Sequence, residues 1–480
     1  MSQGPVAAVL WIPLVAAALL AALPGYRLTS RLNVAASFLT LLAALLLLAS
    51  ERPAPGAYLL VDDLNIVFIV LNCFVAFTTS VFSAGYIQHE LETGRLTATK
   101  LRFYHAMYQM MMFGMNLAFV SNNIGLMWVA VELATLTTVL MVGIYQTHEA
   151  LEAAWKYFIL GSVGIALALF GTILFYTAAQ PVVGEGADAM IWTVLVGRAA
   201  EFDPALLSVA FVFLLLGYGT KVGLAPVHAW LPDAHAEGPT PISAVLSGLL
   251  LNVALYALLR FKILLAANPL AIAPGPLMVA MGLGSLVFAA FMLYRRRDIK
   301  RFFAYSSIEH MGIIVFAFGM GGPLANFAGL LHMVMHSLTK SAIFFAVGNI
   351  AQVKGTQRIA DIKGLTQSHP ALGWGLVIGV LAIAGLPPMG IFMSEFLVVT
   401  SSFARMPLLA VPLVLGILLA LGALLLRLTG VAFGEPTGST APAIGTNLPM
   451  QAHLALVLIA GIYLPPPLVT WFQHVGVLLG

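Results

Sequence analysis

The sequence contains very little charge and almost no cysteine. Only 9% of its 480 residues are Asp, Glu, Lys or Arg, whereas 61% are hydrophobic. A soluble domain carries about 25% charged residues and could not bury so large an apolar share at this length. Cys73 is the only cysteine, which excludes a disulfide framework and a cysteine-ligated metal or iron–sulfur centre. The composition therefore predicts an integral membrane protein with the lipid bilayer as its solvent.

Motifs for nucleotide, flavin or hydrolytic chemistry are also missing. The sequence has no Walker A run and no dinucleotide-binding glycine fingerprint. No arrangement of Ser, His and Asp supports a hydrolase, and a net charge of +3 gives no indication of nucleic acid binding. We therefore expect no catalytic site, no cofactor, no metal and no nucleic acid partner.

Long apolar segments predict the fold. A helix needs about 20 apolar residues to cross a bilayer. Strands of membrane barrels are shorter and alternate apolar with polar residues, so we expect an all-α polytopic membrane protein with about 14 transmembrane helices. The fourteen segments lie near residues 5–23, 32–50, 63–86, 104–121, 123–145, 155–178, 205–231, 240–261, 272–294, 303–320, 324–350, 371–399, 407–431 and 451–471.

Basic residues in the connections predict the orientation. If the N-terminus lies outside, thirteen Lys and Arg residues fall in cytoplasmic connections and five on the opposite side. Cytoplasmic loops of membrane proteins carry an excess of these residues. We therefore expect both termini on the non-cytoplasmic side of the inner (plasma) membrane.

Two predicted spans contain Gly and Pro near their middle. The seventh reads Gly-Tyr-Gly-Thr-Lys-Val-Gly-Leu-Ala-Pro over 217–226, and the twelfth reads Gly-Leu-Pro-Pro-Met-Gly over 385–390. These residues interrupt helical hydrogen bonding, so both helices should unwind within the membrane, although Gly and Pro are also common in membrane helices without such a role. The breaks lie five spans apart, so the broken helices run in opposite directions, as in inverted repeats. We predict helices 1–3 in 1–103, a first repeat in 104–262, an inverted second repeat in 263–435 and helix 14 in 436–480.

Two ionisable residues lie deep in the first predicted repeat. Glu132 is near the middle of the fifth span, and Lys221 is at the break of the seventh. A charge at the bilayer centre costs about 2.5–3.5 kcal/mol, so it needs a partner, water or a function. We predict that the two side chains pair. The carboxylate favours the charged lysine and burial disfavours it, so small movements would load or release a proton. A purely structural ion pair is the alternative.

The eleventh span carries His332, His336 and Lys340. Their spacing of i, i+4 and i+8 places them on one helix face. Because histidine titrates near neutrality, this face predicts a proton relay with internal water. Two histidines at i and i+4 can also bind zinc, but no Cys, Asp or Glu follows on that face. We therefore favour the relay over a metal site.

Three more positions are candidates for the same path. Glu395 follows the second break, where it suits the exit end of the path or caps the second half-helix. Glu309 and His310, early in the tenth span, either join the relay or lie solvated at the interface. His228 belongs to the titratable segment 226–239, predicted as a cytoplasmic loop that feeds protons inward or is only a wet connector.

Several motifs resemble a known family. Lys221 begins the run Lys-Val-Gly-Leu-Ala-Pro-Val-His-Ala-Trp-Leu-Pro-Asp-Ala-His-Ala-Glu-Gly-Pro-Thr-Pro. Ala-Tyr-Ser-Ser-Ile-Glu-His over 304–310 and Ser-Glu-Phe over 394–396 accompany it. Together they resemble, over nearly the whole chain, the antiporter-like subunits of complex I (NADH dehydrogenase subunit 4/5-like) and of Mrp-type antiporters. Within that family the chain is most similar to component F of hydrogenase-4, found in group 4 NiFe-hydrogenase and formate hydrogenlyase complexes.

The resemblance implies roles for matching positions and shows one departure. Four positions match the family's key acid, lysine, histidine and second acid: Glu132, Lys221, His336 and Glu395. The central lysine expected in the eighth span is replaced by Asn252, which cannot titrate. The link between the two halves would then run through water, His332, His336 or Lys340, which puts a full pump path in doubt.

Buried charges and resemblance together predict a proton-translocating subunit of a redox-driven complex. The expected partners are other membrane-arm subunits and a soluble redox arm of NiFe-hydrogenase type. One alternative is a subunit of a multisubunit sodium/proton antiporter, which loses its proton flux when sodium is removed. Another is a quinone-binding oxidoreductase subunit, which needs a redox cofactor or an amphipathic quinone cavity. The sequence offers no cofactor ligands.

Overall fold

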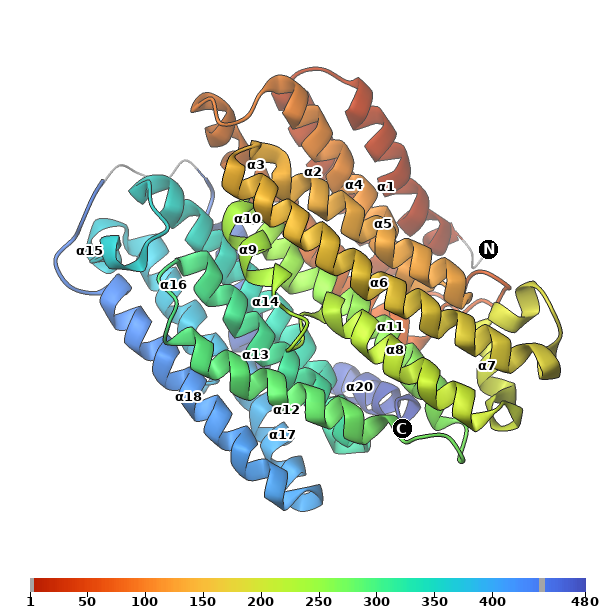
Figure 1. The fold of residues 1–480 in the computed structure, drawn as a ribbon. Coiled ribbons are helices and arrows are strands. Elements are labelled where there is room, and N and C mark those ends of the chain that lie inside the picture. Colours follow the sequence, from red (N-terminus) through yellow and green to blue (C-terminus); the bar gives the residue numbers. More distant parts are fainter. Residues whose placement is uncertain (1–3, 440–444) are drawn as a thin grey trace.

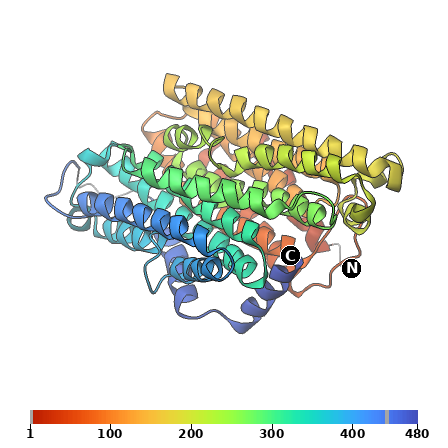
Figure 2. The same cartoon turned by 60° about the horizontal axis from the view of Figure 1, so that its bottom comes forward.

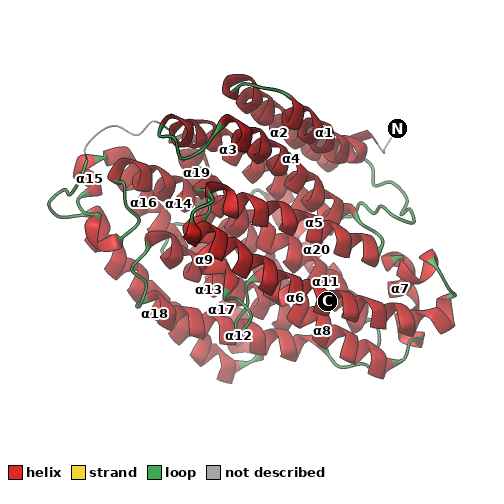
Figure 3. Ribbon diagram, turned by 45° about the horizontal axis from the view of Figure 1, so that its top comes forward, coloured by secondary structure: helices red, strands yellow, loops and turns green. Residues whose placement is uncertain are grey.

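The computed structural model describes residues 4–439 and 445–480, and every regular element in them is a helix (Figure 3). A π-helical turn at Leu246–Leu250 joins α10 to α11. The helices are α1 (Gly4–Ala22), α2 (Tyr26–Ala49), α3 (Asp63–Glu92), α4 (Ala98–Val120), α5 (Ile124–Val142), α6 (His148–Val183), α7 (Trp192–Arg198), α8 (Pro204–Val222), α9 (Trp230–Glu237), α10 (Thr240–Val245), α11 (Leu251–Ala266), α12 (Pro274–Leu293), α13 (Ile299–Met320), α14 (Pro323–Lys354), α15 (Leu365–Ser368), α16 (Pro370–Ile383), α17 (Gly390–Arg405), α18 (Pro407–Ala432), α19 (Leu448–Ile462) and α20 (Pro466–Leu478).

The described helices include eleven that are long and apolar enough to cross a membrane, or twelve if the bent pair α19 and α20 is one span. The all-α membrane fold is thereby confirmed. Each of the other predicted spans also coincides with helix: α4 fills one, and the shorter helices α16 and α17 share another. The exact number of fourteen and the inverted repeat stay predictions.

The long helices lie side by side in one bundle (Figures 1 and 2). Helix α6 packs along α8, α12 along α13, and α4 along α1 and α5. Helices α13, α14 and α11 are almost wholly buried, whereas α1 and α18 present large apolar side chains outward, such as Trp11 and Leu408. Lipid is the matching environment for that surface. The inner helices carry most of the buried histidine and lysine side chains described below.

The two chain ends lie at one end of the bundle. Val6 and Ala7, at the start of α1, line a cavity together with the segment 53–61 that precedes α3. His474, in the last helix, has its Nδ1 3.0 Å from the Asp63 carboxylate at the start of α3. This arrangement agrees with an even number of crossings. Which side of the membrane holds the two ends stays a prediction.

Both predicted helix breaks are present. Helix α8 ends at Gly223 and α16 ends just before Gly385, and these two glycines have positive φ angles of 82° and 65°. Such angles suit glycine because it has no Cβ. In both places the next helix, α9 or α17, starts within a few residues. Each break thus leaves backbone groups outside helix geometry, and Pro226, Pro387 and Pro388 in these two connections are exposed.

Two sequence expectations are wrong in detail. The predicted loop over 226–239 is mostly helix α9, whose Trp230, Leu231 and His235 are fully buried against neighbouring helices. The predicted single span over 451–471 is two helices that meet at 82°. The three consecutive prolines 465–467 explain that bend, because proline removes the backbone donor and clashes with the preceding turn.

Candidate functional site

Lys221 and Glu132 form an ion pair inside the first half of the molecule. Lys221 comes from the last turn of α8 and Glu132 from the middle of α5. The lysine Nζ lies 3.1 Å from the Glu132 Oε2, with the two side chains 1% and 17% exposed. A Cβ at Gly161 of α6 would lie 3.3 Å from this Nζ, so the glycine leaves room for the ammonium group.

Aromatic side chains hold the break beside this pair. The Trp230 indole Nε1 donates a 2.7 Å hydrogen bond to the Thr220 carbonyl, in the last turn of α8, which also accepts from the Gly223 backbone N–H at 3.2 Å. The ring of Tyr157 stacks on Trp230 with centroids 4.2 Å apart, and its hydroxyl contacts Thr138 at 2.8 Å. These contacts tie α5, α6, α8 and α9 together around Lys221. The lysine therefore occupies a position fixed by its surroundings.

Asn252 is a buried residue of α11. Its Nδ2 donates to the Gly248 carbonyl at 3.0 Å and to the Ser337 Oγ at 2.8 Å. The second contact joins α11 to α14 at the residue next to His336. The Asn252 Oδ1 has no hydrogen-bond partner within the described chain. Asn252 thus supplies a polar bridge at the position where the resemblance expects a lysine.

His310, His332 and Glu395 come together from three different helices. They lie on α13, α14 and α17, and all three are buried. The His310 Nδ1 is 3.0 Å from the His332 Nε2 and 3.9 Å from the Glu395 Oε1. The two imidazole rings stack with centroids 5.2 Å apart. His310 is therefore an interior residue, and the predicted alternative of a solvated interface position is wrong.

Glu309 and Ser394 extend this group of side chains at its two ends. The Glu309 Oε2 lies 3.3 Å from the His310 Nε2, and Glu309 is only 2% exposed. At the other end, the His332 Nδ1 contacts the Ser394 Oγ at 2.9 Å, and Ser394 donates to the Ile391 carbonyl at 2.9 Å. Since a hydroxyl has one proton, Ser394 must accept from the His332 Nδ1–H. His332 then presents its Nε2 lone pair toward His310.

His336 and Lys340 occupy the same face of α14 as His332, as their spacing predicts. The His336 ring centroid is 5.6 Å from that of His310, and neither of its ring nitrogens has a hydrogen-bond partner among the described residues. The Lys340 Nζ donates to the Phe303 carbonyl at 2.6 Å. No carboxylate of the described chain lies within 4.0 Å of this ammonium group. Lys340 therefore has no carboxylate at ion-pair distance, although Glu309 interacts with it electrostatically from farther away.

Comparison with known proteins identifies the family. Residues 121–420 match the family described as NADH:quinone oxidoreductase/Mrp antiporter, TM. The chain belongs to this family. The stretch includes Glu132, Lys221 and Glu395, and the resemblance deduced from the motifs is thus confirmed.

Relatives within the family differ widely in similarity. A hydrogenase-4 component F homolog from Methylacidiphilum infernorum (isolate V4) is 66% identical over 473 residues, covering 98% of this chain and 99% of that protein. NADH-quinone oxidoreductase subunit N from Desulforudis audaxviator (strain MP104C) is 28% identical, covering 78% of this chain and 74% of that protein.

Solved structures share the fold. A chain of the membrane-bound sulfane sulfur reductase, an archaeal respiratory membrane complex, matches with a TM-score of 0.88 and 24% identity over 99% of this chain and 97% of its own. A chain of the Mrp complex from Dietzia sp. DQ12-45-1b has a TM-score of 0.83 at 19% identity, over 100% of this chain and 97% of its own. A chain of respiratory complex I from Thermus thermophilus has a TM-score of 0.81 at 23% identity, over 99% of this chain and 100% of its own. These likenesses establish the architecture.

Sequence reasoning passed over a polar cavity at the end of the bundle where α3, α9 and α14 terminate. It has a volume of about 380 Å³, and its lining includes Glu90, Glu237 and Lys300. Glu90 is fully buried and pairs with Arg95 at 3.1 Å. Lys300 donates to two carbonyls at the end of α9, at 3.0 and 2.6 Å. From the sequence, Lys300 was expected only to lie at the membrane surface, because it stands in the first turn of α13.

His235 lies between this cavity and Lys340. It is fully buried, stacks on Phe344 with centroids 4.8 Å apart, and interacts electrostatically with both Lys300 and Lys340. Both of its ring nitrogens lack a hydrogen-bond partner in the described structure. His228, the neighbouring candidate, instead packs against Phe288. Among the described residues, no hydrogen bond or ion pair joins His228 to either group of charged residues, so its role stays a prediction.

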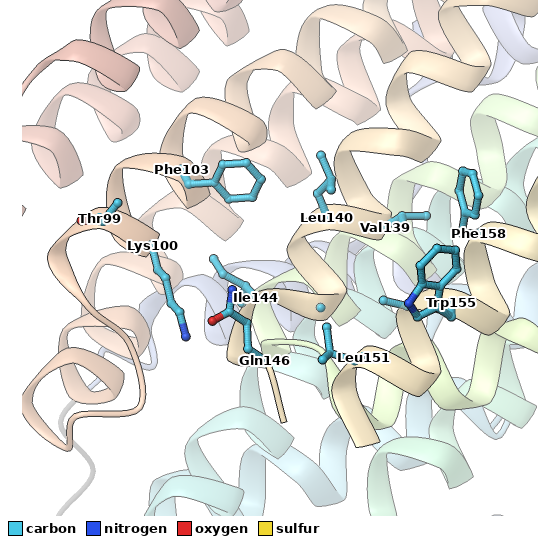
Figure 4. A pocket seen from close by; sticks show the side chains of 12 residues that line it. Thr99, Lys100, Phe103, Val139, Leu140, Ile144, Gln146, Leu151, Trp155 and Phe158 are labelled. Carbon is cyan, nitrogen blue, oxygen red and sulfur yellow. The ribbon is translucent and has the colours of Figure 1, made fainter. Parts of the chain in front are cut away.

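A separate apolar cavity of about 560 Å³ opens between α4, α5 and α6. Figure 4 shows Phe103, Leu140 and Trp155 around it, with Lys100 and Gln146 toward one end. None of the buried residues predicted for proton transfer lines this cavity. It is therefore a feature of the outer, lipid-facing part of the bundle.

Proposed function

We propose that this chain is a proton-translocating membrane-arm subunit of a redox-driven complex. The observation that carries the proposal is the buried Lys221–Glu132 pair at the broken end of α8. A lysine at this depth stays charged only while a carboxylate is near, so a shift of Glu132 changes the tendency of Lys221 to keep its proton. Such a pair can couple movement to proton uptake and release.

The proposed path continues through the second half. In this second part, the proposed path runs from the polar cavity through Lys300 and His235 toward Lys340. From there it passes through the histidines to Glu395. Asn252 and Ser337 supply the polar bridge between the halves, with water as the carrier where side chains do not titrate. The two broken helices support the division into the repeats 104–262 and 263–435, flanked by 1–103 and 436–480.

The proposed partners follow from the relatives. A hydrogenase-4 component F homolog is similar along 98% of this chain, which supports a place beside other membrane-arm subunits. A soluble arm of NiFe-hydrogenase type would then supply the redox energy. The proposed location is the plasma membrane, with both termini on the non-cytoplasmic side.

The decisive experiment uses the assembled complex reconstituted in sealed vesicles. Electron transfer and vesicle pH are followed together, for the wild type and for Lys221→Met. We expect the number of protons moved per electron to fall to background in Lys221→Met while the complex still assembles. Lys156→Met is the matched control, because Lys156 is 48% exposed and pairs at the surface with Glu152. Proton movement at the wild-type ratio in Lys221→Met would refute the proposal.

Sodium separates this proposal from an antiporter. The fold is shared with a chain of an Mrp complex, so the same vesicles are measured with sodium replaced by choline. We expect redox-driven proton movement to persist at the same ratio. Loss of proton movement without sodium would assign the chain to a sodium/proton antiporter instead.

A further inference from the structure

The three side chains His310, His332 and Glu395 offer the ligand atoms of a metal site. One atom of each, two ring nitrogens and one carboxylate oxygen, lies within 4.8 Å of the other two. Two histidines and one glutamate form a recurring ligand set of catalytic zinc. Zinc binds nitrogen and oxygen at about 2.0–2.2 Å in tetrahedral geometry, which places neighbouring ligand atoms roughly 3.3 Å apart. The measured separations of 3.0 and 3.9 Å lie on either side of that value.

The outer contact of His332 is that of a metal ligand. A ligating histidine usually has its second ring nitrogen bonded to a carboxylate, carbonyl or other fixed group. The His332 Nδ1 is fixed by Ser394 at 2.9 Å, whereas the His310 Nε2 lies 3.3 Å from the Glu309 Oε2 outside hydrogen-bond geometry. The lone pair on the His332 Nε2 is therefore already oriented toward the site before a metal ion binds.

Unused groups in the same place point to a ligand. His336 is fully buried, its ring centroid is 5.6 Å from that of His310, and its nitrogens have no partner in the described chain. The Glu309 Oε2 and the His310 Nε2 also count as unsatisfied by hydrogen-bond geometry. Buried polar groups are almost always satisfied, so each exception calls for an explanation. A cation held by His310 and His332 would bring a coordinated water molecule that the His336 ring could bond.

Charge and ligand type select the cation. The carboxylates of Glu395 and Glu309 together balance a charge of +2, as a buried ion requires. Imidazole nitrogen favours zinc and its neighbours over sodium or magnesium, which prefer oxygen ligands. The Glu395 side chain is 10% exposed.

We propose that His310, His332 and Glu395 bind one divalent transition-metal ion of the zinc class. His336 or a water molecule completes the coordination, and the ion takes the place of the proton held between the two imidazole rings. A consequence that rests on the proposed function is that the bound ion blocks proton transfer through the second half.

Cobalt(II) is the probe that tests the site without any measurement of transport. Purified protein in lipid nanodiscs is titrated with Co²⁺, and the visible absorption of four-coordinate cobalt is recorded. We expect one equivalent to produce these bands and one equivalent of Zn²⁺ to remove them. His332→Gln and the nearly isosteric Glu395→Gln should abolish the bands. His453→Gln should keep them, because His453 is equally buried but bonds elsewhere, to Thr78 and the Leu338 carbonyl.

Absence of the bands in wild-type protein, or their persistence in both His332→Gln and Glu395→Gln, would overturn the site. Two variants are used so that failure of one to fold does not decide the result, and size-exclusion profiles report folding. Zn²⁺ added to the pumping vesicles tests the consequence separately. If cobalt binds as expected while zinc leaves proton transfer unchanged, the metal site stands and the blocking role is refuted.

Discussion

The two halves of the molecule each bury a lysine, but they compensate its charge differently. Lys221 meets a carboxylate, Glu132, at 3.1 Å. Lys340 donates to the Phe303 carbonyl at 2.6 Å and has its Nζ 5.4 Å from the centre of the Phe303 ring. The first half therefore stores charge in an ion pair. The second half places its lysine against a backbone carbonyl and an aromatic ring, on the same helix face as two histidines, which can each accept or give up a proton.

This difference predicts in which half a substitution should change stability as well as proton transfer. Removing one member of a buried ion pair leaves an uncompensated charge, whereas removing both members is often neutral for stability. When a charged group that is stabilised by dipoles is replaced, no buried counter-charge is left without a partner. The first half should thus be sensitive in stability as well as in proton transfer, and the second half mainly in proton transfer.

The largest expected effect is in a double-mutant cycle on the ion pair. Glu132→Gln leaves Lys221 without its carboxylate and should lower the free energy of unfolding by about 3 kcal/mol and abolish proton transfer. The double variant Glu132→Gln with Lys221→Met should regain stability to within about 1 kcal/mol of wild type but not regain proton transfer. Denaturation in detergent and vesicle acidification report the two quantities. Additive losses of stability would show that the two residues do not interact.

A smaller effect is expected from two glycines that border the charged groups. Gly385 has φ of 65°, and a methyl group there would overlap the Glu395 carboxylate. Gly385→Ala should therefore displace Glu395 and cost about 1–2 kcal/mol from the backbone alone. Gly161→Ala places a methyl group 3.3 Å from the Lys221 Nζ, and a shift of a few tenths of an ångström at the end of the lysine side chain relieves this contact. We expect it to slow proton transfer less than about twofold, or under about 0.5 kcal/mol in barrier.

The same vesicle assay measures both glycine variants. Gly284→Ala serves as the control, because a Cβ at this glycine meets no other atom within 4 Å. Equal losses of proton transfer in Gly161→Ala and Gly385→Ala would contradict this ranking.

Much of the fold follows from local features of the sequence. Apolar segments of about 20 residues define helices whatever their neighbours are. Gly223 and Gly385 mark the breaks because only glycine adopts their backbone angles freely. The closeness of Glu132 and Lys221 was predictable because each charge needs a partner in lipid. Their role in proton transfer remains a prediction.

Contacts between distant helices could not be read from the sequence. The spacing of His332 and His336 suggested a metal pair on one helix and then argued against it, because no acid shares that face. The structure instead pairs His332 with His310 on α13 and brings Glu395 from α17. Such convergence depends on how three helices pack, which no local pattern encodes. Helix α9 was missed for a related reason, since its proline and its charged residues resemble those of a loop.

The most direct test of the account replaces one buried lysine in each half and measures protons moved per electron. Lys340→Met is compared with Lys221→Met in the same reconstituted complex. If protons pass through both halves on one path, each single variant should reduce the ratio to the same low value, and the double variant should add nothing. A wild-type ratio in Lys340→Met would contradict the account.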